Sequence, residues 1–271
     1  MKVFKFLLAV LIVSGLWSLS AKASQSNRIL CPQRPIKLAM YNLGLLLNKG
    51  QGLDADFVEE LKKRSPCDFE VKVVPRARIW KEIETGGFDM TTSGIETAER
   101  AKFAYFHPYL RQKNYAVLSL KLTPNIASPE DFLLKDQKLQ WGVVRSFKHG
   151  KEADDFLEKL RLQLRVIEAT DSDQLLKMLQ GDRIAGIFAL PIVFRHKLVE
   201  YNLENKVKVL DWDKKENGIE HGLVLSKKSF SPEQAKAWGE LINKMHRDGT
   251  IEKLLLKYLP ESEAKAALIK L

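Results

Sequence analysis

The chain has 271 residues and a formal net charge of +10, with 44 lysines and arginines against 34 aspartates and glutamates. A basic surplus can indicate a surface for nucleic acid or anionic membrane, but these lysines are spread along amphipathic segments, without a dense basic run interleaved with aromatic residues. Two cysteines and five scattered histidines do not have the spacing of metal ligands. We therefore expect a solvated basic surface, with no metal, cofactor or nucleic-acid partner.

Residues 1–23 have the features of a secretory signal peptide. Lys2 and Lys5 precede an apolar segment that is short for a membrane span, and Ala21-Lys22-Ala23 supplies a small-x-small cleavage pattern. We expect the mature protein to begin near Ser24 and to reach the periplasm; an uncleaved membrane anchor is the alternative. Because the removed segment holds three lysines and no acid, the mature charge is about +7.

Cys31 and Cys67 both follow the predicted cleavage site, and two thiols in an exported protein suggest one disulfide. Each precedes a predicted strand, 36–41 and 69–74. If these are neighbouring parallel strands, both cysteines lie at the same edge of the sheet. A bond between them would stabilise the fold by about 3–4 kcal/mol.

Strand-like and helix-like segments alternate along the mature chain, which is typical of an α/β protein with parallel sheets. The helix predicted at 54–64 has acids at its start and bases at its end, as the helix dipole prefers. After the third strand, 88–93, comes Thr-Ala-Glu-Arg and an apolar run that ends at His107-Pro108-Tyr109. The predicted strands are 36–41, 69–74, 88–93, 139–144, 164–169, 184–188, 206–210 and 222–228. The predicted helices are 54–64, 76–85, one after Ser128-Pro129, 151–160, 171–179, one from Pro191, 231–250, 251–259 and a short tail helix.

Three segments resemble bacterial extracellular solute-binding proteins in sequence and in order: GLDADFVEEL (52–61), GGFDMTTSGIETAERAKFAYFHPYL (86–110), and HGLVLSKKS (221–229) with MHRDGTIEKLLLKYL (245–259). The likeness is closest to the polar amino-acid-binding group, which has the type II periplasmic-binding-protein fold. It implies two lobes, each a mainly parallel sheet flanked by helices, joined by two crossovers with the ligand between them. Lobe one would be 24–110 plus 222–271, and lobe two 111–221.

The resemblance also implies where a ligand binds. In the family, the arginine of this motif forks onto the ligand's carboxylate, and Arg100 occupies that position. A planar guanidinium matches a carboxylate in bidentate fashion. Backbone amides and hydroxyls at Thr92, Ser93 and Gly94 would complete an anion-binding rim, and Thr97 would start the following helix. The alternative is that Arg100 pairs with a glutamate on a surface helix.

The chain departs from the family's pattern at several positions. The acid that usually holds a ligand's ammonium group falls on about Leu190, so the site loses a negative charge. Positive charges are possible instead at Arg76, Arg78 and Arg145, although each can equally point to solvent. Tyr41 and Phe147 can line the cleft or pack in the core or hinge, and Trp80 is interpreted as core. The predicted ligand-binding residues are Tyr41, Arg76, Thr92, Ser93, Gly94, Arg100, Arg145, Ser146 and Phe147.

These features favour a monomeric, non-enzymatic receptor that captures a carboxylate-bearing solute, an amino acid or related organic anion, for the permease of an ABC transporter. One alternative is an enzyme that resembles periplasmic cyclohexadienyl (prephenate/arogenate) dehydratases, with Glu168 or Asp171 as the proton-transfer acid. For Asp171, a helix N-cap is the simpler role. A free-standing sensory binding protein is a further alternative.

Overall fold

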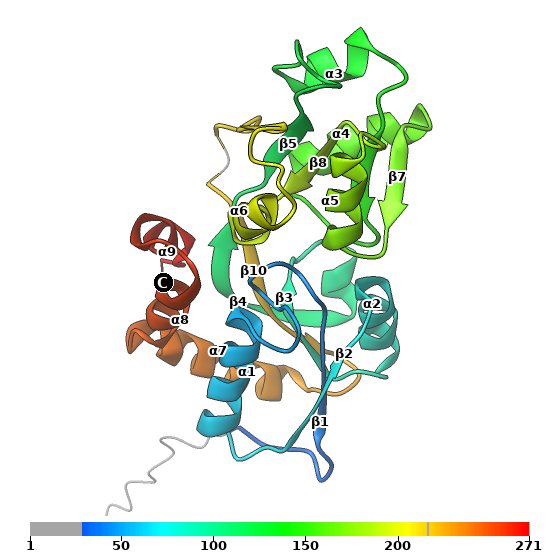
Figure 1. Cartoon of the computed structure of the whole chain (residues 1–271). Helices are drawn as coiled ribbons and strands as arrows, with labels where there is room; N and C mark the ends of the chain where they lie inside the picture. The colour runs from blue at the N-terminus through cyan, green and yellow to red at the C-terminus, as the bar shows by residue number, and fades with distance from the viewer. Residues whose placement is uncertain (1–28, 216, 271) are drawn as a thin grey trace, which may run out of the picture.

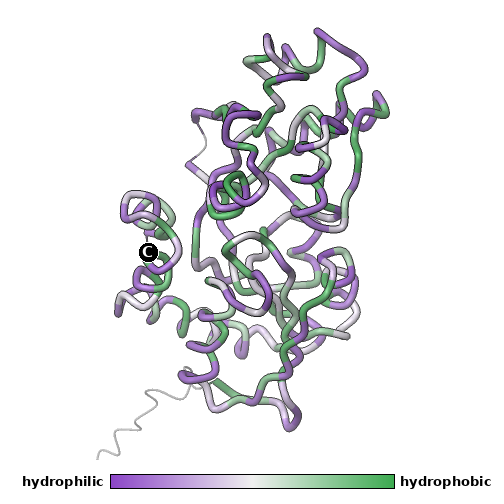
Figure 2. Tube along the Cα trace, viewed as in Figure 1, coloured by the Kyte–Doolittle hydropathy of each residue, from purple (hydrophilic) through white to green (hydrophobic). Residues whose placement is uncertain are grey.

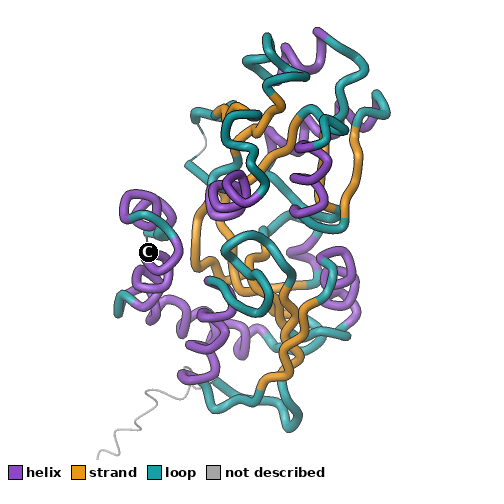
Figure 3. The backbone as a smooth tube through the Cα atoms, in the orientation of Figure 1, coloured by secondary structure: helices purple, strands orange, loops and turns teal. Residues whose placement is uncertain are grey.

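The computed structural model describes residues 29–215 and 217–270, so the predicted signal peptide lies outside the described residues. Two lobes lie one above the other, each built on its own five-stranded sheet (Figure 1). Figure 3 shows the helices packed around the strands of each lobe. The predicted arrangement, two α/β lobes joined by two crossovers, is confirmed.

The first sheet has the strand order β2-β1-β3-β10-β4. β1 pairs in parallel with β2 and β3, whereas β10 is antiparallel to β3 and β4. Its strands are β1 (Ile36–Met40), β2 (Phe69–Val73), β3 (Met90–Gly94), β4 (Ala104–Gln112) and β10 (Ile219–Ser226). The helices of this lobe are α1 (Leu53–Arg64), α2 (Arg76–Thr85), the 3-10 helix η1 (Arg100–Lys102), α7 (Pro232–Arg247), α8 (Thr250–Tyr258) and α9 (Glu261–Ala267).

The second sheet has the order β7-β6-β8-β5-β9, with β6 parallel to β7 and β8, and β5 antiparallel to β8 and β9. Its strands are β5 (Tyr115–Ser119), β6 (Trp141–Val144), β7 (Val166–Ala169), β8 (Gly186–Ala189) and β9 (Val207–Leu210). Its helices are α3 (Pro129–Lys135), α4 (Lys151–Leu162), α5 (Ser172–Gln180) and α6 (Pro191–Glu200). The chain passes between the lobes after β4 and again before β10.

Strand β4 corrects one sequence expectation. The apolar run does not end at His107-Pro108 but continues through it as an edge strand of the first sheet. Proline is tolerated there because an edge strand has fewer ladder hydrogen bonds to lose. The pairing with β10 also shifts by one residue between His221 and Gly222. Gly222 faces Pro108, and a Cβ on it would come within 2.7 Å of the carbonyl oxygen of His107.

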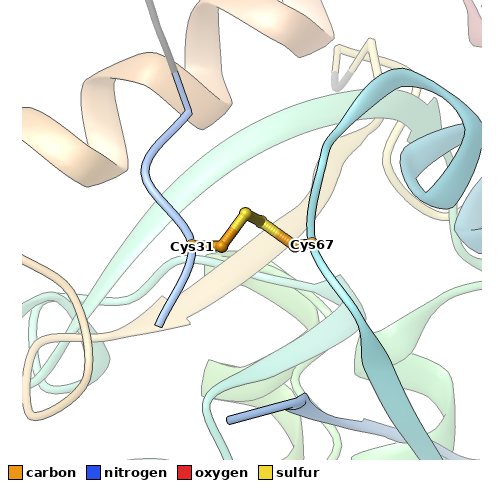
Figure 4. The surroundings of a disulfide bond; sticks show 2 residues. All are labelled: Cys31 and Cys67. Carbon is orange, nitrogen blue, oxygen red and sulfur yellow. A yellow bond between two sulfur atoms is a disulfide. The ribbon is translucent and has the colours of Figure 1, made fainter. Parts of the chain in front are cut away.

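The predicted disulfide is present. Cys31 and Cys67 are bonded, with their Cα atoms 5.2 Å apart (Figure 4). The two cysteines precede β1 and β2, whose parallel register begins at Ile36 and Phe69. The bond therefore ties together the starts of two neighbouring strands, as the sequence argument required.

Hydrophobic residues form one continuous core in the first lobe and two clusters in the second. Figure 2 shows hydrophilic and hydrophobic residues following one another along the helices, as in amphipathic helices that cover an apolar core. In the described part of the chain, none of the helices combines the length and apolar character that a membrane crossing needs.

Candidate functional site

Two buried arginines meet where the lobes touch. Arg76 opens α2 and Arg100 opens η1, both in the first lobe, and they are only 2% and 7% exposed. The turn after β6 in the second lobe, which carries Ser146 and Phe147, contacts both guanidinium groups. The interlobe region is therefore positively charged and shielded from solvent.

Arg100 connects the two lobes. Its Nη1 donates to the carbonyl oxygen of Ile95 at 2.9 Å, and its Nη2 donates to the carbonyl oxygen of Ser146, in the other lobe, at 2.8 Å. The guanidinium lies flat on Trp80, with its Cζ 3.6 Å from the ring centroid. Burial, and then the charge of Arg76, lower the pKa of Arg100 to about 9. The hydrogen-bond acceptors of this guanidinium are thus neutral carbonyl oxygens, and neither of them is a carboxylate.

Arg76 has a different environment. Its Cζ lies 4.4 Å from the ring centroid of Tyr41 and 4.5 Å from that of Phe147, so one aromatic ring from each lobe contacts the guanidinium. Among the described residues, none accepts a hydrogen bond from its Nε, Nη1 or Nη2. Burial lowers the pKa of Arg76, and nearby Tyr41 and Asp54 oppose that shift. No acceptor in the described part of the chain therefore meets the geometry of a hydrogen bond to these donors, and the nearby Tyr41 side chain only partly offsets the effect of burial on the pKa.

Trp80 supports both arginines, a role that its interpretation as core misses. The indole is buried against Phe103 and Phe106, and it lies 5.8 Å from the Cζ of Arg76 as well as under Arg100. The signal in the sequence is the spacing: Arg76 and Trp80 are four residues apart in α2 and therefore share one helical face.

A buried carboxylate lies beneath the site. Asp54, in the first turn of α1, accepts hydrogen bonds from the hydroxyls of Thr92, Ser93 and Tyr109 at 2.8, 2.9 and 2.6 Å. Burial raises the pKa of Asp54 to about 6, while these hydroxyls oppose the shift. The hydroxyls that we expected to form an anion-binding rim are thus engaged by Asp54. Gly94, the third rim residue, is buried against Val224 at the end of β3.

Two histidines near the site are uncharged at neutral pH. His221 in β10 is fully buried, and His149 after β6 is 7% exposed, with its Nδ1 3.2 Å from Oδ1 of Asn114. Burial and then the charge of Arg76 lower the pKa of each to about 3. Both histidines are therefore neutral and add no further positive charge beside the arginines.

Other predicted positions lie elsewhere. Arg145 is exposed and its Nε pairs with Glu168 at 3.2 Å, while Arg78 pairs with Glu82 at 3.1 Å on the outside of α2. The structure therefore brings Arg76, and not these two arginines, to the interlobe cluster. Asp171 caps α5 by accepting a hydrogen bond from the backbone N–H of Gln174.

The segment after Thr97 also differs from expectation. Only the three-residue helix η1 follows the motif, instead of an α-helix. The Thr97 hydroxyl accepts a hydrogen bond from the backbone N–H of Arg100 at 3.2 Å, which fixes the turn that presents the arginine.

At Leu190 the lobes make an apolar contact. Leu190, Ile192 and Val193 pack into the core of the first lobe, and the N–H of Leu45 donates to the carbonyl of Ile192 at 3.0 Å. A cavity of about 30 Å³ beside this contact is lined by Leu43, Phe147, His149 and Leu190, among others. The described residues contain no cluster of three or more histidine, cysteine or acidic side chains arranged to hold a metal ion.

The family model for bacterial extracellular solute-binding proteins, family 3, matches residues 45–261. The chain belongs to this family. A comparison with curated proteins gives no match. Solved structures of solute-binding proteins share the fold over most of their length, at sequence identities that show the fold alone.

Three of these structures illustrate the likeness. An ancestral arginine-binding protein bound to arginine has a TM-score of 0.69 at 17% identity, covering 83% of this chain and 98% of its own. The arginine-, lysine-, histidine-binding protein ArtJ from Geobacillus stearothermophilus has 0.67 at 18%, covering 86% and 100%. The GluR0 ligand-binding core from Nostoc punctiforme, in complex with L-glutamate, has 0.64 at 16%, covering 83% and 99%.

Proposed function

We propose that this solute-binding protein captures a small carboxylate-bearing solute between its lobes, through Arg100, and delivers it in the periplasm to the permease of an ABC transporter. The observation that carries the proposal is the position of Arg100: buried, flat on Trp80, and hydrogen-bonded to a carbonyl of each lobe. A ligand bound there contacts both lobes and so stabilises their closed arrangement.

A carboxylate suits this position better than the present carbonyl partners. Its two oxygens accept the parallel N–H groups of a guanidinium, and such charge-assisted bonds are about twice as strong as neutral ones. Burial and the neighbouring Arg76 disfavour the charge on Arg100, and an anion relieves both effects. The hinge for the required opening lies in the two crossovers between the lobes, near residues 111–114 and 217–221.

The residue at Leu190 favours an acid over a zwitterion. Leu190 is 1% exposed and packs against apolar side chains of the first lobe, so no carboxylate there meets a ligand's ammonium group. An organic anion is therefore the proposed ligand, with a standard α-amino acid second. The structural relatives described as binding arginine or glutamate support a small amino-acid-sized solute.

A thermal-shift screen of the mature protein against amino acids, dicarboxylates and aromatic acids tests the proposal. A ligand at 100 times its Kd stabilises the folded state by about 2.7 kcal/mol, which for a chain of this size raises Tm by about 5–10 °C. We expect such shifts from organic acids. Shifts from sugars or polyamines, with none from any carboxylate, would refute the proposal.

The dehydratase alternative has its own test. Glu168 is exposed and paired with Arg145, and Asp171 caps a helix, so both acids have structural partners. We expect the purified protein to leave prephenate and arogenate unchanged over hours. Formation of phenylpyruvate or phenylalanine that is lost in Glu168→Gln would favour the enzyme instead.

A further inference from the structure

We infer that the solute carries a second acid group, bound by Arg76, and that the protein is a receptor for small diacids. This inference rests on the proposed function, because it places the first acid group on Arg100. It adds a second anion subsite, formed by Arg76 between the aromatic rings of Tyr41 and Phe147.

The unsatisfied donors of Arg76 point to a missing acceptor. Tyr41 and Phe147 stabilise the charge through their rings, but an aromatic ring does not replace an acceptor for the N–H groups in the guanidinium plane. Those groups lie in the buried interlobe region without a hydrogen-bond partner among the described residues. Buried polar groups are normally hydrogen-bonded, so three buried nitrogens of one side chain without a partner in the described chain require an explanation.

Arg165 provides an internal comparison. It is also buried, at 1% exposure, and its Cζ likewise lies near an aromatic ring, 5.1 Å from the centroid of Phe132. Yet its Nε donates to the carbonyl of Leu139, and its Nη2 donates to the carbonyls of Phe132 and Asp136. This chain therefore satisfies a structural arginine with its own carbonyl groups. No carbonyl group of the described residues accepts a hydrogen bond from Arg76. This difference fits an acceptor that belongs to a bound solute.

The charges around the site favour two acid groups rather than one. Asp54 is a buried carboxylate near Arg76, but its oxygens accept three hydroxyl groups instead of the guanidinium. The histidines at 149 and 221 remain neutral. A monoacid on Arg100 leaves the charge of Arg76 buried without an anionic partner, whereas a diacid neutralises both cations.

The spacing and the aromatic rings limit the ligand further. Arg76 and Arg100 both lie over Trp80, at 5.8 and 3.6 Å from its ring centroid, so a short carbon chain suffices to join the two acid groups. The position between Tyr41 and Phe147, where a cationic ligand group could stack, holds the chain's own guanidinium. Basic solutes such as arginine are therefore rejected for two reasons. The positive charges of Arg76 and Arg100 repel them, and the Arg76 side chain already fills the position between the two rings.

Calorimetry with matched ligands tests this inference. Succinate and glutarate are compared with succinamate and glutaramate, which keep the shape and one carboxylate but replace the other with a neutral amide. We expect at least one diacid to bind the wild-type protein ten times or more tighter than its monoamide. Equal affinities within each pair would overturn the inference, and this comparison requires no variant protein.

Variants then locate the second acid group. Arg76→Met should weaken binding of the diacid at least tenfold and should reduce the preference for the diacid over its monoamide to less than threefold. Arg78→Met, two residues along the same helix and ion-paired to Glu82, is the control and should change neither. If Arg76→Met leaves diacid affinity unchanged while Arg100→Ala abolishes it, the second subsite is wrong and the proposed function stands. If Arg100→Ala has no effect on either ligand, the proposed function itself fails.

Discussion

Replacing Arg76 with methionine should stabilise the ligand-free protein while impairing its binding of diacids. The change removes a buried cation whose Nε, Nη1 and Nη2 have no hydrogen-bond partner in the described structure. Methionine is unbranched and flexible, so it can occupy the same space between Tyr41 and Phe147 without a charge. The substitution therefore separates the stability of the empty fold from its function.

The magnitude follows from opposing effects. A buried donor without a partner costs about 1–3 kcal/mol, and Arg76 has three such nitrogens. The interactions with the rings of Tyr41, Phe147 and Trp80, worth about 0.5–2 kcal/mol each, are lost in the variant. Replacement of buried charges by apolar side chains of similar volume is often stabilising by about 1–4 kcal/mol. We expect a net gain of about 2 kcal/mol, which raises Tm by about 4–8 °C.

Urea denaturation of the mature protein at neutral pH, with no organic acid present, measures this gain. Arg78→Met is the matched control, because that side chain is exposed and should change the unfolding free energy by less than about 0.5 kcal/mol. A loss of more than about 1 kcal/mol in Arg76→Met would show that the guanidinium is satisfied in the empty protein, and would refute the reasoning.

Three further predictions concern stability. The folded state should lose stability between pH 7 and pH 5, because His149 and His221, with folded pKa values of about 3, cannot take the protons that their unfolded forms accept below pH 6.5. Each histidine costs about 2 kcal/mol at pH 5, and Asp54, with a raised pKa of about 6, returns about 1 kcal/mol as it protonates, so the net loss is about 3 kcal/mol. His221→Gln should remove about two thirds of this net loss in urea titrations, and an unchanged loss would contradict the assignment. Reduction of the Cys31–Cys67 bond should lower the unfolding free energy by about 3–4 kcal/mol, and mass spectrometry that finds two alkylatable thiols in unreduced protein would contradict the bond. Asp54→Ala should cost about 3–5 kcal/mol, because three buried hydroxyls lose their acceptor, whereas a cost below about 1 kcal/mol would show that these hydrogen bonds matter little.

Local signals and a family resemblance were enough to predict the fold and the disulfide. Ser128-Pro129 does begin α3 with a capping box, and Asp171 does cap α5, because these features depend on residues that are close in the sequence. The local pattern does not predict that β4 continues through Pro108, because the pairing of this strand depends on β10, more than a hundred residues further along the chain. Local patterns do not reveal such a partner.

The site was harder to predict for the same reason. Whether Arg76 is buried depends on Phe147, which comes from the other lobe. Likewise, the Thr92 and Ser93 hydroxyls turn to Asp54, which α1 brings beneath β3. Within its own segment, only the four-residue spacing from Trp80 separates Arg76 from the exposed Arg78.

The most direct test of the central claim is calorimetric titration of the best ligand from the thermal-shift screen into wild-type protein, Arg100→Ala, Arg100→Lys and Arg145→Ala. Arg145 is the control, because it is an exposed arginine paired with Glu168 in the second lobe. Truncating one partner of a buried charge pair costs about 2–5 kcal/mol, so Arg100→Ala should reduce affinity by a factor of about 30 or more. Arg100→Lys should restore only part of it, since an ammonium lacks the bidentate fork, and Arg145→Ala should match wild type. Wild-type affinity in Arg100→Ala would contradict the claim that this cleft binds its solute through Arg100.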